Sequence, residues 1–387
     1  MKVKAIQNKF RDIFHEEPLL IRSPGRVNLI GEHTDYNEGF VLPAAIDKEI
    51  ILALRPSGKL KSSLYAADLN DYFEFQIDSI KKFDNGWPNY LLGVVDQLQK
   101  QSYKIEGFNC VFGGDIPVGA GLSSSAAIEA GLAFALNEIF GLGIDKLNLV
   151  KMAQKAENEF VGVQCGIMDQ FVNIFGAKNK ALKLDCRSLV YEYYPFVLDD
   201  VSIVLCDTQV SHSLASSEYN IRRQQCERGV IALQKTNPNI RSLRDVTIEM
   251  LESHKDIINP ISYIRCFYVI CENNRLIAAC DDLKKGDLKA FGEKMYLTHT
   301  GLRDNYEVSC PKLDFLVDLT LDIDDVLGSR MMGGGFGGCT INLIKQEDLD
   351  EIIKEIQIMY KFKWGENLKV YVTNIEAGTS IIKYENP

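Results

Sequence analysis

A glycine- and serine-rich segment in the first half of the chain has the composition of a phosphate-binding loop. It follows an expected strand over residues 105–112 and precedes an expected helix that stops near Gly141. Glycine lets a backbone approach an anion closely, and a helix start offers unpaired N–H groups and a positive dipole end. A serine-capped helix after a tight turn would have the same composition. The predicted loop consists of Gly119, Ala120, Gly121, Leu122, Ser123, Ser124 and Ser125.

This loop matches neither of the two common nucleotide-binding motifs. A P-loop carries a lysine directly after its glycines, and no lysine stands here. The dinucleotide-binding motif needs a third glycine at the position that Ser124 occupies. We therefore predict a phosphate-binding loop of neither type.

A carboxylate on an apolar helix face is the second candidate for chemistry. In the helix expected over residues 144–161, Glu157 shares a face with Val150 and Ala153, whereas Glu159 points elsewhere. A buried carboxylate needs a partner, and Mg²⁺ or a buried salt bridge would each supply one. The spacing alone leaves both possibilities open.

Composition excludes several classes of protein. The 387 residues include Lys+Arg 43 and Asp+Glu 53, so the net charge of -10 argues against binding to a nucleic-acid backbone. No apolar stretch approaches the length of a membrane span, and the N-terminus lacks the apolar core of a secretion signal. Ten cysteines without a C-x-x-C pair indicate reduced thiols, so we expect a cytoplasmic protein.

The expected elements form an irregular mixture of strands and helices. Strands are predicted over residues 41–54, 105–112, 182–196, 201–207 and 339–344, and helices over residues 4–15, 144–161 and 216–234, with a glycine-rich loop region after residue 15. Without a regular strand–helix alternation, this order predicts an α+β protein. We place a lobe boundary near the 182–196 segment, which gives an N-terminal lobe of residues 1–185 and a C-terminal lobe of residues 186–387.

Three segments resemble one enzyme family. The loop and its flanks, P-x-G-x-G-L-S-S-S-A, are similar to the nucleotide loop of the GHMP small-molecule kinases, which include galactokinase, homoserine kinase and mevalonate kinase. Residues 25–36, GRVNLIGEHTDY, resemble the galactokinase signature, and residues 328–338 resemble the third motif of the family. The resemblance implies a two-lobed kinase fold with the active site in the cleft between the lobes. It also implies ATP-dependent phosphorylation of the anomeric hydroxyl of α-D-galactose, giving α-D-galactose 1-phosphate and ADP.

The same resemblance assigns roles to individual residues. Asp169, in the segment CGIMDQ, is the implied proton acceptor, and Arg26 is its implied partner. Metal binding is implied for Ser125 and Glu157, which would hold Mg²⁺, and nucleotide binding for the loop together with Trp87 and Tyr90. The implied sugar-binding residues are Glu32, His33, Thr34, Asp35, Gly166 and Tyr219.

Two alternatives stay open at this point. A kinase for a related sugar, N-acetylgalactosamine or L-arabinose, would carry the same motifs, as would a galactose sensor without activity. Met332 and the segment 265–269 depart from the usual family pattern, which affects the surroundings of the site only. We expect a sugar and ATP as partners, with neither nucleic acid nor membrane, and a monomer as the simplest state.

Overall fold

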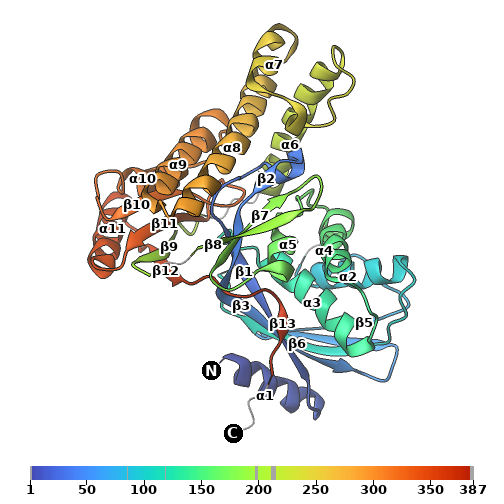
Figure 1. Ribbon diagram of the computed structural model, residues 1–387. Coiled ribbons are helices and arrows are strands. Elements are labelled where there is room, and N and C mark those ends of the chain that lie inside the picture. Colours follow the sequence, from blue (N-terminus) through green and yellow to red (C-terminus); the bar gives the residue numbers. More distant parts are fainter. Residues whose placement is uncertain (1, 85, 118, 197–198, 211–214, 384–387) are drawn as a thin grey trace.

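The computed structural model describes residues 2–84, 86–117, 119–196, 199–210 and 215–383. Figure 1 shows two lobes, the lower built on a sheet with helices and the upper carrying a long helical arm. The α+β class predicted from the sequence is confirmed. Among the described residues, no helix is long and apolar enough to cross a membrane.

The first lobe is built on a six-stranded sheet of order β13-β1-β3-β6-β4-β5. These strands are β13 (Ser380–Ile381), β1 (Leu19–Asn28), β3 (Pro43–Pro56), β6 (Phe108–Gly114), β4 (Lys61–Ala66) and β5 (Asp71–Gln76). Successive side chains of a strand point to opposite faces. In β3, Ile51 and Ala53 accordingly pack against helix α1 (Lys2–Phe14), while Leu52 and Leu54 face the main core.

Strand β1 lies where the sequence predicted a glycine-rich loop region, so that prediction was wrong for Leu19–Asn28. Pro24 and Gly25 are uncommon inside strands, which is why the segment resembled a loop. The pairing with β3 has a register shift between Pro24 and Arg26. This irregularity in the strand accommodates Pro24 and Gly25. Arg26 is therefore held by a central strand rather than by a loop.

Four helices cover the face of the sheet opposite α1. They are α2 (Pro88–Lys100), α3 (Ser124–Phe140), α4 (Lys146–Lys155) and α5 (Met168–Phe175). The helix predicted over 144–161 ends in a π-helical turn, Ala156–Val161, which carries Glu157. A small sheet of β2 (Phe40–Val41), β7 (Lys180–Asp185) and β8 (Tyr191–Pro195) lies beside them.

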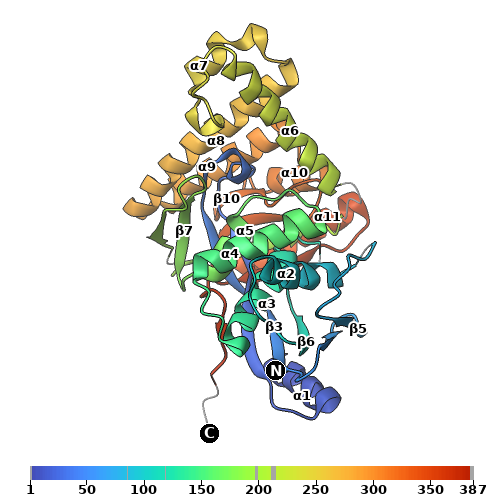
Figure 2. The ribbon, with the colours of Figure 1, turned by 90° about the vertical axis from the view of Figure 1, so that its right-hand side faces the viewer.

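The second lobe contains a four-stranded sheet of order β10-β11-β9-β12. Its strands are β10 (Val326–Met331), β11 (Cys339–Lys345), β9 (Val201–Asp207) and β12 (Lys369–Thr373). Helices α9 (Leu288–Thr300), α10 (Pro311–Asp318) and α11 (Leu349–Trp364) pack around it. Helices α6 (Ala215–Gln234), α7 (Ile248–Ser253) and α8 (Pro260–Lys285) form the arm, which Figure 2 shows projecting from the rest of the molecule.

The chain crosses between the lobes more than once. The predicted boundary, 185/186, falls at the end of β7 within the β7–β8 hairpin, and it stays a prediction. After the second lobe, the chain returns to the first, where β13 pairs with β1 through Ile381 and Ile21. Figure 1 accordingly shows β13, in red, among the strands of the first lobe.

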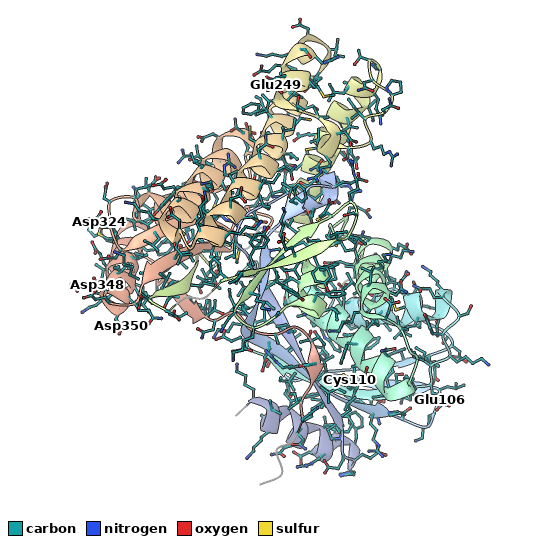
Figure 3. The ribbon with its side chains drawn as sticks, in the orientation of Figure 1. Glu106, Cys110, Glu249, Asp324, Asp348 and Asp350 are labelled. Carbon is teal, nitrogen blue, oxygen red and sulfur yellow. The ribbon has the colours of Figure 1, made fainter. Side chains whose placement is uncertain are left out.

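All ten cysteines are free, and Cys110 is one of those buried in the core of the first lobe. Figure 3 places Cys110 within that lobe and several acidic side chains at the periphery. Glu249 lies at the tip of the arm, and Asp324, Asp348 and Asp350 lie at the outer end of the second lobe.

Candidate active site

A cavity of about 280 Å³ lies where β1 and the turn after it, the π-helical turn after α4, the start of α5 and the glycine run after β10 meet. Residues from both lobes line it, and the motif segments that are distant in sequence converge here. The lining residues are Arg26, Glu32, His33, Asp35, Glu157, Val163, Cys165, Gly166, Met168, Asp169, Tyr219, Gly333, Gly334 and Gly335.

Arg26 and Asp169 form a two-pronged ion pair at this cavity. Nε of Arg26 donates to Oδ1 of Asp169 and Nη2 donates to Oδ2, both at 2.7 Å. The Arg26 side chain is 7% exposed and that of Asp169 is 28% exposed, so the pair is shielded on the arginine side and open on the carboxylate side. Parallel N–H···O bonds of this kind fix both groups in one plane.

The loop before α3 is tied to the same ion pair. Nη1 of Arg26 donates to the carbonyl of Gly121 at 2.5 Å. Ser123 adopts a left-handed backbone and makes no capping bond to the helix, and its hydroxyl instead donates to Oδ2 of Asp169. The serine-capped helix considered as an alternative is therefore not what forms, and the first N–H groups of α3 lack that side-chain cap.

Glu157 is buried beside the same loop. Its carboxylate accepts hydrogen bonds from Ser125 and, at 2.7 Å, from Nε2 of Gln170. Burial raises the pKa of Glu157, and the negative charge of Asp169 raises it further. Glu159, two residues on, is exposed and bonds to Gln97, as the helical spacing predicted.

Glu129 is a buried carboxylate to which the sequence analysis gave no role. It lies in α3 with no exposed surface, beside the side chains of Glu157 and Gln170. Burial raises the pKa of Glu129 well above its usual range, and neighbouring Glu157 adds to this. The sequence did offer a signal for a special role of this residue, because a glutamate is unusual in an otherwise apolar helix.

Arg330 is a buried arginine to which the sequence analysis gave no role. It is fully buried in β10, and its guanidinium donates to the backbone of the first lobe and to Oε1 of Glu32 at 3.0 Å. The amide of Gly333 donates to the same oxygen at 2.8 Å. Glu32 is thereby fixed at the cavity by contacts from the second lobe, although it belongs to the first.

Burial changes the protonation of the remaining polar groups. It lowers the pKa of His33 to about 4, so the imidazole is neutral near pH 7. It raises the pKa of Asp35 to about 7, with a further contribution from the charge of Asp169. Tyr219 from α6 completes this wall of the cavity, with its ring 5.3 Å from that of His33 between centroids.

Known families match the chain along most of its length. The galactokinase galactose-binding signature matches residues 8–56, the GHMP kinases N terminal domain residues 89–177, and the GHMP kinases C terminal residues 279–361. A galactokinase of Clostridium acetobutylicum is 43% identical over 387 residues, covering 98% of this chain and 99% of the relative. A galactokinase of Roseiflexus sp. is 40% identical over 374 residues, covering 96% of this chain and 95% of the relative.

The chain belongs to the galactokinases of the GHMP kinase family. The crystal structure of Lactococcus lactis galactokinase complexed with galactose agrees in fold, with a TM-score of 0.95 at 35% identity, and covers 99% of this chain and 100% of that one. A mevalonate kinase structure with 20% identity and a TM-score of 0.65 shares the fold. The activity of the chain is thus the ATP-dependent phosphorylation of galactose.

Ten of the residues expected to bind substrates lie outside the cavity lining, namely Thr34, Trp87, Tyr90 and the loop residues Gly119, Ala120, Gly121, Leu122, Ser123, Ser124 and Ser125. The hydroxyl of Thr34 is buried against the carbonyls of Gly31 and Phe40, so it holds the turn that presents its neighbours. Trp87 packs on Phe112 and donates its indole N–H to Asp71 at 2.8 Å. Tyr90 lies near the carboxylates of Glu157 and Glu129. Burial is the main cause that raises the pKa of Tyr90, and the charges of these two carboxylates raise it further. Their substrate-binding roles stay predictions.

Gly166 is the position at which a side chain is least tolerable in the cavity. A Cβ there would lie 1.8 Å from Oδ2 of Asp35, so Gly166→Ala must displace that carboxylate. We expect a rise of about tenfold or more in the KM for galactose, because a loss of 1.4 kcal/mol is tenfold in binding. Initial rates with galactose and ATP varied in turn measure this, and the KM for ATP should hardly change. An unchanged galactose KM would place Asp35 outside the sugar site.

The raised pKa of Asp35 predicts a pH dependence. Because that pKa is about 7, the carboxyl is neutral below pH 7 and ionised above it. Only the ionised form accepts hydrogen bonds through both oxygens, so kcat/KM for galactose should fall as the pH decreases through 7. A pH profile of the wild type and of Asp35→Asn measures this limb, which the variant should lack. A limb that persists in the variant would assign it to another group.

Proposed function

We propose that the chain transfers the γ-phosphoryl group of ATP to the anomeric hydroxyl of α-D-galactose, giving α-D-galactose 1-phosphate and ADP. The observation that carries this proposal is the Arg26–Asp169 pair at the cavity, hydrogen-bonded to the loop before α3 through Ser123 and Gly121. The carboxylate of Asp169, which faces the proposed sugar site, is thereby connected to the proposed phosphate-binding loop.

Asp169 takes the proton of the sugar hydroxyl. As the bond between that oxygen and the γ-phosphorus forms, the bond to the β–γ bridging oxygen breaks, and the hydroxyl proton passes to the carboxylate. Its open side faces the cavity, whereas Arg26 and Ser123 hold the other sides. Arg26 orients the carboxylate and offsets charge on the phosphoryl oxygens, which carry most of the charge in a loose transition state.

Glu32, Asp35, His33 and Tyr219 bind the sugar hydroxyls. Each is buried or borders the cavity, and Glu32 is anchored by Arg330. A buried polar group left unpaired by the wrong epimer costs about 1–3 kcal/mol. Two such losses suffice to favour galactose strongly over glucose.

The site also fits Mg²⁺. Glu157 is a buried carboxylate whose hydrogen-bond partners are neutral, and the hydroxyl of Ser125 lies against it. Oxygen donors of this kind suit Mg²⁺, which typically takes one or two carboxylates and completes its shell with phosphate oxygens and water. When bound, the ion would neutralise charge on the nucleotide phosphates. Among the described residues, no cluster of three or more His, Cys, Asp or Glu side chains could hold a metal ion.

A coupled ADP-release assay over a panel of sugars tests this proposal. Galactose should give the highest kcat/KM, and phosphorus NMR of the product should show an α-linked 1-phosphate. Faster turnover of N-acetylgalactosamine or L-arabinose would overturn the galactose assignment, and binding without turnover would favour the sensor. The monomeric state and the cytoplasmic location remain predictions of the sequence.

A further inference from the structure

Three of the proposed sugar-binding side chains lie on one turn that follows β1, namely Glu32, His33 and Asp35. We call residues 31–40 the sugar turn. Its backbone is left-handed at His33, with φ of 61°, and at Glu38, with φ of 58°. Non-glycine residues in this region are strained and persist where the surroundings over-determine them. We therefore expect neighbouring elements to hold the turn in this shape.

Helix α8 of the second lobe is hydrogen-bonded to both ends of the sugar turn. The amide of the first residue of the turn donates to Oε1 of Glu272 at 2.9 Å, and the amide of the last residue donates to Oδ1 of Asn273 at 2.8 Å. Between them, the hydroxyl of Tyr268 donates to the carbonyl of Glu32 at 3.1 Å. Figure 1 shows β2, at the end of the turn, beside α8. We call Tyr268, Glu272 and Asn273 the α8 anchors.

The anchors at the two ends of the turn are themselves fixed by further bonds. The carboxylate of Glu272 has no exposed surface and forms an ion pair with Arg275. The hydroxyl of Thr298 in α9 lies 3.1 and 3.0 Å from the two oxygens of this carboxylate. Nδ2 of Asn273 donates to the carbonyl of Val269 at 3.1 Å. Neither side chain can rotate without losing these bonds, so the position of α8 sets the position of the turn.

Two glycines let the backbone of the sugar turn lie directly on α8. Gly31 has φ of 99°, and a Cβ there would lie 2.6 Å from Cδ1 of Leu276. A Cβ at Gly39 would meet the side-chain amide of Asn273. Packing this close prevents a shift of the turn toward α8, and the hydrogen bonds oppose a shift away from it.

We propose that the α8 anchors position the sugar turn and thereby determine the affinity for galactose. Tyr268, Glu272 and Asn273 are not part of the cavity lining, so they act through the backbone of the turn rather than on the sugar itself. Their side-chain hydrogen bonds go to the sugar turn, α8 and α9. We therefore expect them to affect galactose and not ATP. The role in sugar binding rests on the proposed function.

Tyr268→Phe keeps the ring but removes the hydroxyl that donates to Glu32. The KM for galactose should rise by about three- to tenfold, the range of one ordinary hydrogen bond, with kcat and the KM for ATP unchanged. Tyr296→Phe is the matched control, because its hydroxyl bonds to Thr320 in place of the turn. Initial rates with galactose and ATP varied in turn measure these constants. A wild-type galactose KM, or an equal rise in both KM values, would overturn the proposal.

Glu272→Gln should change the galactose KM in the same direction. Only one terminal atom of glutamine is an acceptor, so the variant can serve the Gly31 amide or Arg275 but not both. Thr298→Ser is the matched control, because serine keeps the hydroxyl that bonds to Glu272. If Glu272→Gln does not fold, Tyr268→Phe alone decides.

Hydrogen exchange tests the anchoring without any sugar. In Asn273→Ala the amide of Phe40 loses its acceptor, so its exchange in the sugar-free protein should accelerate by about three- to tenfold. Mass spectrometry of peptides spanning residues 31–40 measures the rate. Wild-type exchange in this variant would overturn the anchoring of the turn by α8. Faster exchange with an unchanged galactose KM would instead overturn its role in sugar binding.

Discussion

Asp169→Asn is expected to lower kcat by about 10²–10⁴-fold while galactose still binds. The amide has nearly the shape of the carboxylate but cannot accept the hydroxyl proton, and positioned proton acceptors contribute on this scale. Single-turnover rates with ATP and galactose measure the loss, and calorimetric titration with galactose measures the binding that remains. Asp304→Asn, on the protein surface in a pair with Arg303, is the matched control.

Retained turnover in Asp169→Asn would remove Asp169 from the role of proton acceptor. A variant that neither binds galactose nor melts at the wild-type temperature would report unfolding instead. The melting temperature therefore accompanies each assay. The variant Asp169→Glu complements Asp169→Asn, because glutamate keeps the carboxylate but moves this group away from Arg26.

Arg26→Ala is expected to lower kcat by about 10³-fold. The change removes the cation that pairs with Asp169 and offsets phosphoryl charge, and arginines in this role contribute on that order or more. It also releases the carbonyl of Gly121, so the loop before α3 loses one of its anchors. The KM for ATP should rise as well, in contrast to Asp169→Asn. Initial rates over a matrix of ATP and galactose concentrations measure both effects.

Arg26→Lys separates charge from geometry. Lysine keeps the positive charge but cannot form the two parallel bonds to Asp169, so its kcat should lie between those of the wild type and Arg26→Ala. Arg303→Lys is the matched control, because Arg303 makes the same two-pronged contact with Asp304 on the protein surface. Wild-type activity in Arg26→Lys would show that charge alone suffices.

The elements with clear periodicity were predictable from the sequence. The strand Val201–Asp207 has the predicted bounds, and helix α6 begins within a residue of its prediction. Strand β1 was not predictable, because Pro24 and Gly25 suggest a turn and only pairing with β3 makes the segment a strand. The π-helical turn after α4 has no local signature, although it determines where Glu157 lies.

The site was predictable only through the motifs. Arg26 and Asp169 are 143 residues apart, and nothing in their local sequence indicates that they meet. Arg330 was part of a recognised motif, but its contact with Glu32 depends on how the two lobes pack. Tyr306 carried no signal in the sequence, because its hydrogen bond to Tyr36 of the other lobe depends on how the lobes pack.

The return of the chain to its first sheet sets an order of events during synthesis. Strand β13 forms one edge of that sheet, and Thr379 bonds to Asn173 at 2.6 Å beside Ser23. The first lobe of a nascent chain therefore lacks an edge strand until residues 379–381 have left the ribosome. Until then the outer edge of β1 is unpaired, and unpaired edges invite association with other chains. The edge of β1 at Ile21 and Arg22 is thus open to such association for nearly the whole of synthesis.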